Sequence, residues 1–344
     1  MGAPCPHALL ITIDTEGDNL WSTPETITTR NSAFLGRFQS LCEKYGLKPT
    51  WLTNWEMARC PVFRELASDA VARGAAEIGM HLHAWNTPPL EPLTEDDFLH
   101  QPLLIHYPVA LVREKIARLT DLLEDTFEAK MVSHRAGRWG LDETYARLLE
   151  HRGYLVDCTV TPHVSWRSET GDTDFRGCDY TSFPGHAYLL DLDDIRRPGC
   201  SALLEIPMSI VPGPDPLIAR VLRRIGRKSR PLHRFADRFF PPQFWFRPNR
   251  HNGHALREFL GRDSVAQAGY LQFMMHSSEL MPGGSPRFPT EKSIERLYET
   301  LEELFAAART RFVGMTLAEY RRRFNTGHSE SAQPAGTPAA RSLA

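Results

Sequence analysis

Short apolar runs alternate along this chain with longer stretches in which apolar residues recur at helical spacing. The run HALLITI at residues 7–13 is continuous and leads into acidic residues. This pattern is typical of a buried parallel strand whose carboxyl end opens onto a site. In residues 31–45, apolar side chains repeat on one helical face, and a glycine follows as a stop signal. The two segments predict a strand followed by a helix.

The same alternation continues through most of the sequence. Further strands are predicted at residues 49–54, 76–83, 131–134, 154–160, 202–210, 270–276 and 311–315. Further helices are predicted at residues 61–73, 108–128, 142–151 and 291–309. Repeated strand and helix units of this kind predict an α/β fold built on a parallel sheet or a barrel.

Two segments depart from this alternation. Near residues 213–260 we expect a helical insertion, within which residues 217–240 have the pattern of a basic amphipathic helix. Its basic face either lies in solvent or docks to an anionic membrane or to a lipid-linked pyrophosphate. Residues 327–344 are small, polar and proline-containing, so we expect them to be disordered. Residues 1–326 are then expected to form one barrel domain.

Composition and charge narrow the functional classes. The formal net charge of −2 argues against a nucleic-acid partner and against a membrane role for the protein as a whole. The six cysteines are scattered without a Cys-x-x-Cys pair, which indicates reduced thiols. The first apolar run lacks a preceding basic region and is too short for a signal peptide or a spanning helix. We therefore expect a cytoplasmic location.

Reactive side chains cluster where the predicted strands end. Acidic residues follow the first strand, two histidines close the third, a histidine and an arginine close the fourth, and a histidine closes a late strand. These residues are Asp14, Glu16, Asp18, His81, His83, His134, Arg135 and His276. Since the carboxyl ends of parallel strands form the ligand-binding face of α/β folds, we expect these side chains to converge.

The histidines of EIGMHLHAW suggest a metal site. His81 and His83 are two residues apart in a predicted strand, so their side chains point the same way and can both reach one ion. On its own this pair could equally be two surface histidines of a loop. The other strand-end residues favour the metal interpretation.

The segments ITIDTEGD, EIGMHLHAW, SHRAGRWG and FMMHSSEL follow the order of the motifs of the polysaccharide deacetylase family, which this chain resembles over about residues 8–320. The resemblance implies a distorted seven-stranded (β/α) barrel and a divalent metal held by one carboxylate and two histidines. It also implies a separate aspartate base with an arginine partner, and a histidine acid on a late strand.

The first motif departs from the usual form of the family. The family has adjacent aspartates, the first a base and the second a metal ligand, whereas Thr15 separates the two carboxylates here. By the resemblance Asp14 is the base and Glu16 the metal ligand, with Asp18 as the alternative ligand.

The later motifs complete the implied site. The family spaces its two histidines four apart, but the fourth position after His81 is Trp85, so His83 takes the place of the second ligand. Arg135 resembles the arginine partner of the base, and His276 resembles the histidine acid. The fourth motif is not evident, and nearby Asp157 and Trp166 stay unassigned.

The chemistry of amide hydrolysis explains these residue types independently. A bound Zn²⁺, or another divalent metal, brings the pKa of coordinated water down to roughly 7 and polarises the acyl oxygen. Asp14 would take a proton from the attacking water, and His276 would protonate the departing amine. Arg135 would keep Asp14 ionised and oriented.

Several interpretations stay open at this point. The enzyme hypothesis is a metal-dependent hydrolase that removes N-acetyl groups from a carbohydrate, such as a surface polysaccharide or its precursor. The alternatives are an amidase acting on a non-sugar C–N bond and a carbohydrate-binding protein without turnover. Trp85 and Trp139 are candidate sugar-binding residues, although these tryptophans and Trp51 fit a core role as well.

Overall fold

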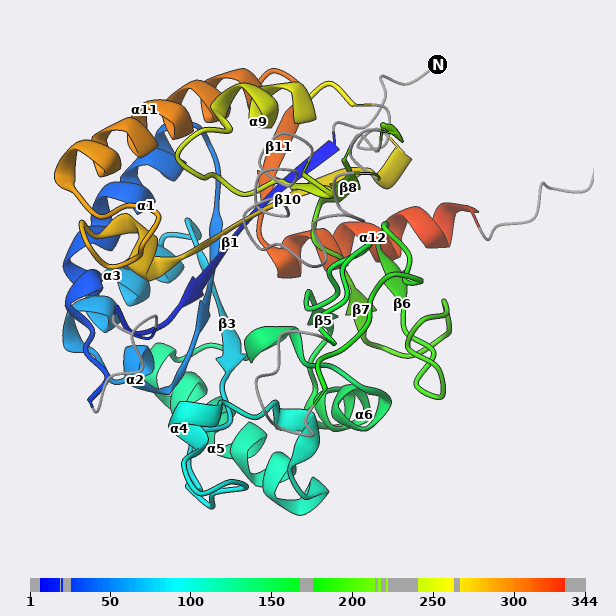
Figure 1. The fold of residues 1–344 in the computed structure, drawn as a ribbon. Helices are drawn as coiled ribbons and strands as arrows, with labels where there is room; N and C mark the ends of the chain where they lie inside the picture. Colours follow the sequence, from blue (N-terminus) through cyan, green and yellow to red (C-terminus); the bar gives the residue numbers. More distant parts are fainter. Residues whose placement is uncertain are drawn as a thin grey trace, which may run out of the picture.

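A curled sheet of mainly parallel strands forms the centre of the molecule (Figure 1). The computed structural model describes residues 7–18, 20, 26–167, 176–213, 216–217, 221, 241–262 and 267–331. Along the sheet the strands follow the order β10-β1-β2-β3-β4-β5-β7-β6. Their bounds are β1 His7–Thr15, β2 Pro49–Thr53, β3 Glu77–Leu82, β4 Ser133–Ala136, β5 Val156–Asp157, β6 Tyr188–Leu189, β7 Leu204–Glu205 and β10 Tyr270–His276.

Strand β1 has partners on both of its edges. It pairs along most of its length with β10, and the register sets Asp14 directly beside His276. Its other edge is divided, because β11 (Phe312–Met315) pairs with the first half of β1 and β2 pairs with the second half. Among the described residues the pairing does not return from β6 to β10, so the sheet is a curled half-barrel. The predicted distorted α/β barrel class is confirmed.

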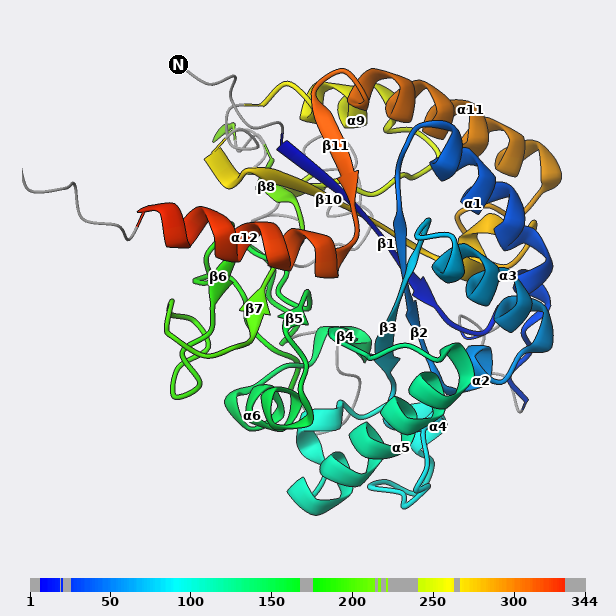
Figure 2. The same cartoon turned by 180° about the vertical axis from the view of Figure 1, so that it is seen from behind.

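Helices cover the outer side of the sheet (Figures 1 and 2). Their ends carry the expected signals: Pro61 occupies the first turn of α3, and Asp142 caps α6 by accepting from the Tyr145 N–H at 2.7 Å. Gly153 ends α6 in the left-handed region, with φ +98°. The main helices are α1 Leu35–Lys44, α3 Pro61–Ala72, α5 Val109–Phe127, α6 Glu143–Arg152 and α11 Glu291–Ala308.

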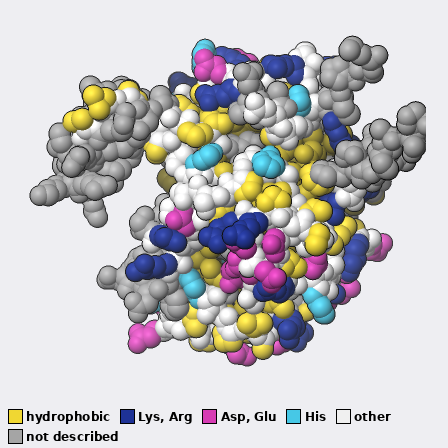
Figure 3. Space-filling view, turned by 90° about the vertical axis from the view of Figure 1, so that its right-hand side faces the viewer, with side chains coloured by type: hydrophobic (Ala, Val, Ile, Leu, Met, Phe, Trp, Pro, Cys, Tyr) yellow, Lys and Arg dark blue, Asp and Glu magenta, His cyan; other side chains and the backbone are white. Residues whose placement is uncertain are grey.

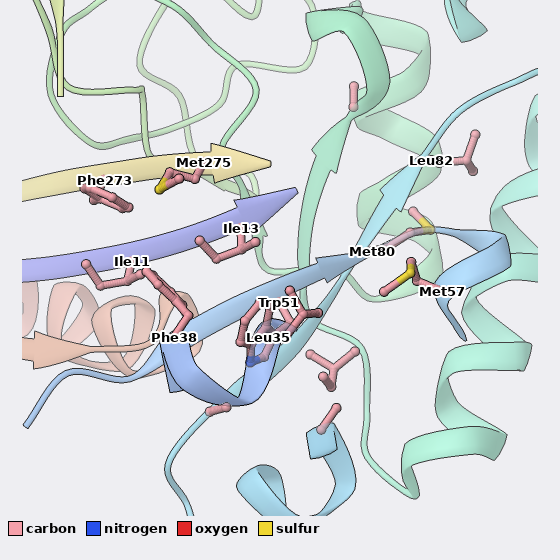
Figure 4. Close-up of a cluster of buried hydrophobic side chains, with 14 of the residues drawn as sticks. Ile11, Ile13, Leu35, Phe38, Trp51, Met57, Met80, Leu82, Phe273 and Met275 are labelled. Atoms are coloured by element: carbon pink, nitrogen blue, oxygen red, sulfur yellow. The ribbon is translucent and has the colours of Figure 1, made fainter. Parts of the chain in front are cut away.

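The core lies between the sheet and these helices. Figure 4 shows Ile11 and Ile13 of β1 packed beside Phe38 of α1 and Trp51 of β2. Trp51 is fully buried and donates from its indole Nε1 to the Gln39 side chain at 3.0 Å. Trp51 is therefore a core residue, and burial excludes it as a sugar platform.

Some predicted strands are shorter or divided in the structure. The predicted strand at 202–210 splits into β7 and β8 (Ile210–Pro212), and 154–160 gives only the two residues of β5. β8 leaves the main sheet and pairs antiparallel with β9 (Gln243–Trp245). β5 and β7 each end at a buried acid, Asp157 and Glu205, whose carboxyl groups bond to His134 and to the Val160 backbone N–H.

The predicted insertion is described only in part. Most of the basic segment 217–240 lies outside the described residues, so its proposed helix stays a prediction. The described remainder contributes β9 and the short helix α9 (Gly253–Phe259). Near the other end, α12 (Leu317–Ser331) continues past residue 327, where the disordered tail was expected to begin.

The described surface and cysteines agree with the expectations from composition. On the face drawn in Figure 3, basic and acidic side chains lie next to one another, with hydrophobic ones among them. The cysteines Cys42, Cys60, Cys158, Cys178 and Cys200 are all free thiols. Among the described helices, none combines the length and the apolar character that crossing a membrane requires.

Phe38 offers a test of this core. Its ring is fully buried, with edge contacts to Trp51 and Phe305 at centroid distances of 6.0 and 6.3 Å. Phe38→Ala should lower the free energy of unfolding by about 3–5 kcal/mol, because it leaves a cavity in a packed core. Urea unfolding measures the change. Phe34→Ala is the control, since Phe34 is 39% exposed and should cost far less. Equal losses in the two variants would contradict the described packing.

Candidate metal centre and catalytic site

Six of the predicted site residues meet at the carboxyl end of the sheet. The strand register accounts for this convergence, because Asp14 lies beside His276 and His81 lies beside Arg135 on neighbouring strands. They line, or lie directly beneath, a cavity of about 1270 Å³. The six residues are Asp14, Glu16, His81, His83, Arg135 and His276.

Glu16, His81 and His83 direct their ligand atoms at one point. The Nε2 atom of His83 lies 3.0 Å from Glu16 Oε2 and 3.1 Å from His81 Nε2, and His81 Nε2 lies 3.6 Å from Glu16 Oε2. All three side chains are buried, and their ligand atoms lie within 4.8 Å of one another. Zinc bonds of about 2.0–2.1 Å at tetrahedral angles separate ligand atoms by roughly 3.3 Å, so the observed spacing fits a zinc ion.

The tautomer of His81 also suits a metal ligand. Its Nδ1 lies 3.0 Å from the backbone oxygen of Arg135, and a carbonyl oxygen can only accept, so Nδ1 carries the proton. The Nε2 lone pair therefore points toward Glu16 and His83. A backbone partner of this kind is the usual way to orient a ligating imidazole.

His83 is fixed by packing instead of by a second hydrogen bond. Its buried Nδ1 has no partner among the described residues. Gly137, just after β4, passes so close that a Cβ there would lie 2.5 Å from this nitrogen. Only glycine fits at this position. Gly137 was not singled out from the sequence, because its contact with His83 is purely a matter of the fold.

The loop that follows His83 is tied down by a buried lysine. The ammonium of Lys115, from α5, donates to the carbonyl oxygens of Ala84, Thr87 and Pro89 at 2.8, 2.6 and 2.5 Å. Burial lowers the pKa of Lys115 to about 8. Helical periodicity assigned Lys115 no role, yet its three bonds hold the loop that carries Trp85.

Asp14 forms a buried ion pair with Arg135. Arg135 Nη1 lies 2.5 Å from Asp14 Oδ1, and Nη2 donates to the Thr12 hydroxyl at 2.8 Å. Burial works to raise the pKa of Asp14, but the guanidinium of Arg135 and the nearby imidazoles hold it below its usual value. The other oxygen, Oδ2, lies 3.9 Å from both His81 Nε2 and His276 Nε2. Asp14 is thus an ionised carboxylate. One of its oxygens faces Glu16, His81 and His83, the three candidate metal ligands, which we call the metal group.

His276 lies across the site from Arg135. Its Nε2 is 3.7 Å from Glu16 Oε1, while its Nδ1 is 2.8 Å from Arg247 Nη2. Because a guanidinium can only donate, Nδ1 accepts in this arrangement, and the proton of the neutral ring is on Nε2. Glu279 lies behind the ring, with Oε2 at 3.6 Å from Nδ1. Sequence reasoning missed both Arg247 and Glu279.

Asp18 and His134 do not join the metal group. Asp18 accepts from the backbone N–H of Arg30 at 2.7 Å and from the Thr28 hydroxyl at 3.1 Å, so it closes a loop. His134 is fully buried, with Nδ1 at 2.5 Å from Asp157 and Nε2 at 2.7 Å from the Tyr145 hydroxyl. The geometry therefore favours Glu16 over Asp18 as the carboxylate ligand, and it explains Asp157 as a structural partner.

Tryptophans form one wall of the cavity. Trp139 stacks on Trp166 with an interplanar angle of 10°, and Trp245 contacts both rings at centroid distances of 5.9 and 6.2 Å. Trp85 lies separately, 4.3 Å from the His83 ring. All four line the cavity, which is the position that a substrate-binding role of Trp85 and Trp139 would require. Trp245 was missed, because only the pairing of β8 with β9 brings it here.

Solved structures provide the comparison. A protein from Mycobacterium smegmatis described as a polysaccharide deacetylase aligns over 99% of this chain and 97% of its own, with TM-score 0.50 and 14% sequence identity. The chain has the polysaccharide deacetylase fold. Neither the protein-family models nor the curated proteins include a match to the sequence.

The same fold also carries a different activity. The 4-alpha-glucanotransferase from Thermococcus litoralis aligns over 93% of this chain and 40% of its own, with TM-score 0.50 and 13% identity. Since one fold supports unrelated reactions, the assignment of a function depends on the side chains of the site.

Metal binding can be tested directly on the carboxylate ligand. Glu16→Gln should lower the affinity for Zn²⁺ by more than about 100-fold, which exceeds the usual cost of losing a residue that only supports a ligand. Calorimetric titration with Zn²⁺ measures the affinity. Binding should also weaken as the pH falls, because protons compete for the ligand atoms.

Asp18→Asn is the matched control for this test. Asp18 bonds to Thr28 and the Arg30 backbone, so its loss should leave zinc affinity close to that of the unaltered protein. The opposite ranking of the two variants would overturn the choice of Glu16.

Proposed function

We propose that this protein is a metal-dependent hydrolase that removes N-acetyl groups from a carbohydrate. The observation that carries the proposal is the buried group of Glu16, His81 and His83 beside an ionised Asp14, facing His276 across one cavity. The fold shared with a polysaccharide deacetylase supports the same class. The tryptophan wall offers apolar ring faces of the kind on which sugars stack.

Zn²⁺ fits the donor set, and Glu16, His81 and His83 would hold it. When bound, such an ion supplies Lewis acidity, which activates water and polarises an acyl oxygen. Burial raises the pKa of Glu16, but His276, His81 and His83 more than offset this and leave it well below the usual value. Burial lowers the pKa of His83. Burial also works to lower the pKa of His81, but Asp14 and Glu16 more than offset this and raise it, so a metal would have to displace a proton from His81. A carboxylate and neutral imidazoles are the forms that bind a metal.

Asp14 has the properties of a general base. Its pairing with Arg135 keeps it ionised at neutral pH, and its Oδ2 faces the ligand group at 3.9 Å from His81 Nε2. It would accept a proton from the attacking water. Arg135 has no exposed surface, so its role is to orient Asp14 and not to contact substrate.

His276 has the position of a general acid. Its Nε2 faces Asp14 and Glu16, where a departing amine would lie. Donation from the imidazolium form requires Nδ1 to carry a proton as well, and Glu279 Oε2, 3.6 Å away, is the acceptor available for it. In the neutral ring Nδ1 accepts a hydrogen bond from Arg247, whereas in the imidazolium form it would donate one to Glu279.

The other hypotheses differ in measurable ways. An amidase acting on a non-sugar C–N bond would use the same reaction centre but would not need the tryptophan wall. A non-catalytic carbohydrate-binding protein would bind sugars without releasing acetate. Release of acetate from N-acetylated oligosaccharides by zinc-loaded protein tests the proposal, and absence of release from a panel of such sugars would refute it.

A cytoplasmic location and contact of residues 217–240 with an anionic membrane stay predictions of the sequence.

The roles of Asp14 and His276 can be tested separately from metal binding. Asp14→Asn and His276→Ala should each lower kcat by at least about 100-fold, because each removes a proton transfer. Steady-state acetate release measures kcat, and metal analysis of the same samples should show zinc retained. Near-normal turnover in either variant would contradict the assigned role.

A further inference from the structure

One side of the cavity contains more positive charge than its own acids neutralise. Arg247, which follows β9, and Arg287, which follows the short helix at Ser277–Leu280, both line the cavity. Both guanidinium groups reach the same oxygen, Glu279 Oε1, at 3.0 and 3.2 Å. Two arginines therefore share one carboxylate, and the cluster has a net charge of about +1.

The described residues that line the cavity do not balance this charge. Asp14 and Glu16 are the only carboxylates among the described residues that line the cavity, and both belong to the proposed reaction centre. Arg250 also lines the cavity. A bound divalent ion would add positive charge. The cavity therefore attracts anions.

Arg247 is mostly buried beside the cavity and is held in place by its neighbours. Its side chain is 13% exposed, while that of Glu279 is fully buried. The Arg247 Nε atom is buried and lacks a hydrogen-bond partner among the described residues. An unsatisfied buried N–H of this kind costs free energy. The backbone is fixed as well, because the Asn252 side chain donates to the Arg247 carbonyl at 2.8 Å.

Arg287 supplies the accessible half of the pair. It lines the cavity, and its side chain is 42% exposed. Burial lowers the pKa of Arg287, and the repulsion of the neighbouring Arg247 lowers it further. A second anion between them would relieve this repulsion. Guanidinium forks bind carboxylate and phosphate oxygens in a planar, bidentate way.

We propose that Arg247 and Arg287 form an anion subsite, so that the substrate is an acidic N-acetylated sugar with a carboxylate or phosphate next to the reacting amide. This inference rests on the proposed function. The subsite lies on the far side of the His276 ring from Glu16, because Arg247 contacts Nδ1 whereas Nε2 faces the metal group. An anion there would be close to the amine that leaves.

Binding tests the subsite without any turnover. Calorimetry would compare glucuronate, glucose 6-phosphate and glucose with the zinc-loaded protein. We expect at least one acid to bind about ten-fold more tightly than glucose, and Arg287→Gln to remove most of that preference. The two acids distinguish a carboxylate from a phosphate ligand. Arg287 is the better target, because Arg247 also contacts His276.

Two control variants distinguish the subsite from a general effect of charge and from anion binding by the metal. Arg37→Gln removes an exposed arginine that pairs with Glu295 on the outer helices, and it should leave the preference intact. His83→Ala removes one candidate metal ligand but keeps Arg247 and Arg287. An anion held by Arg287 should therefore still bind. Equal binding of acids and glucose, an unaffected Arg287→Gln variant, or loss of anion binding in His83→Ala would each overturn the subsite.

Turnover then separates this inference from the proposed function. The ratio of kcat/KM for an acidic N-acetylated sugar to that of its neutral parent should be at least about 10, and it should fall toward 1 in Arg287→Gln. If no sugar releases acetate but anion binding still depends on Arg287, the subsite stands and the proposed function fails. If neutral sugars react as well as acidic ones and Arg287→Gln leaves their ratio unchanged, the proposed function stands and the subsite fails.

Discussion

The buried ion pair of Arg135 and Asp14 is the interaction on which the rest of the site depends. Arg135 also donates to the Thr12 hydroxyl and to the Cys158 carbonyl, and its own carbonyl accepts from His81. One residue of β4 thereby fixes groups on β1, on β3 and just beyond β5. A buried guanidinium is costly to leave unpaired, so these strands can settle only in the register that satisfies it.

Periodicity predicted the main helices and the central strands because each is set by local sequence. Phe38 and the other apolar residues of α1 face the core as their spacing requires. Periodicity did not give the ends of the strands within 154–160 and 202–210. Each of these apolar runs contains a buried acid, Asp157 or Glu205, and the strand ends depend on partners that are distant in the sequence. α12 was missed although Leu317 and Tyr320 recur at helical spacing and are buried, because only the polar residues after them were considered.

The candidate site was predictable to the extent that it follows strand ends. His81 and His83 point the same way, and parallel strands bring Asp14 and His276 together. The choice between Glu16 and Asp18 required loop contacts that alternation along a strand does not encode. Arg247 and Glu279 were missed for the same reason, because their contacts with His276 depend on how β9 and the turn after β10 are folded.

The shared edge of β1 has a consequence for how the molecule folds. The strand that carries Asp14 pairs with β2, from nearby in the sequence, but also with β10 and β11, from the last quarter of the described chain. Contacts between such distant segments form slowly, since a long loop must close before they contribute free energy. Until β10 and β11 have been synthesised, one edge of β1 and part of its other edge are therefore unpaired. The candidate site is among the last parts of the molecule to be assembled, and the partly paired sheet is the species that chaperones would need to protect.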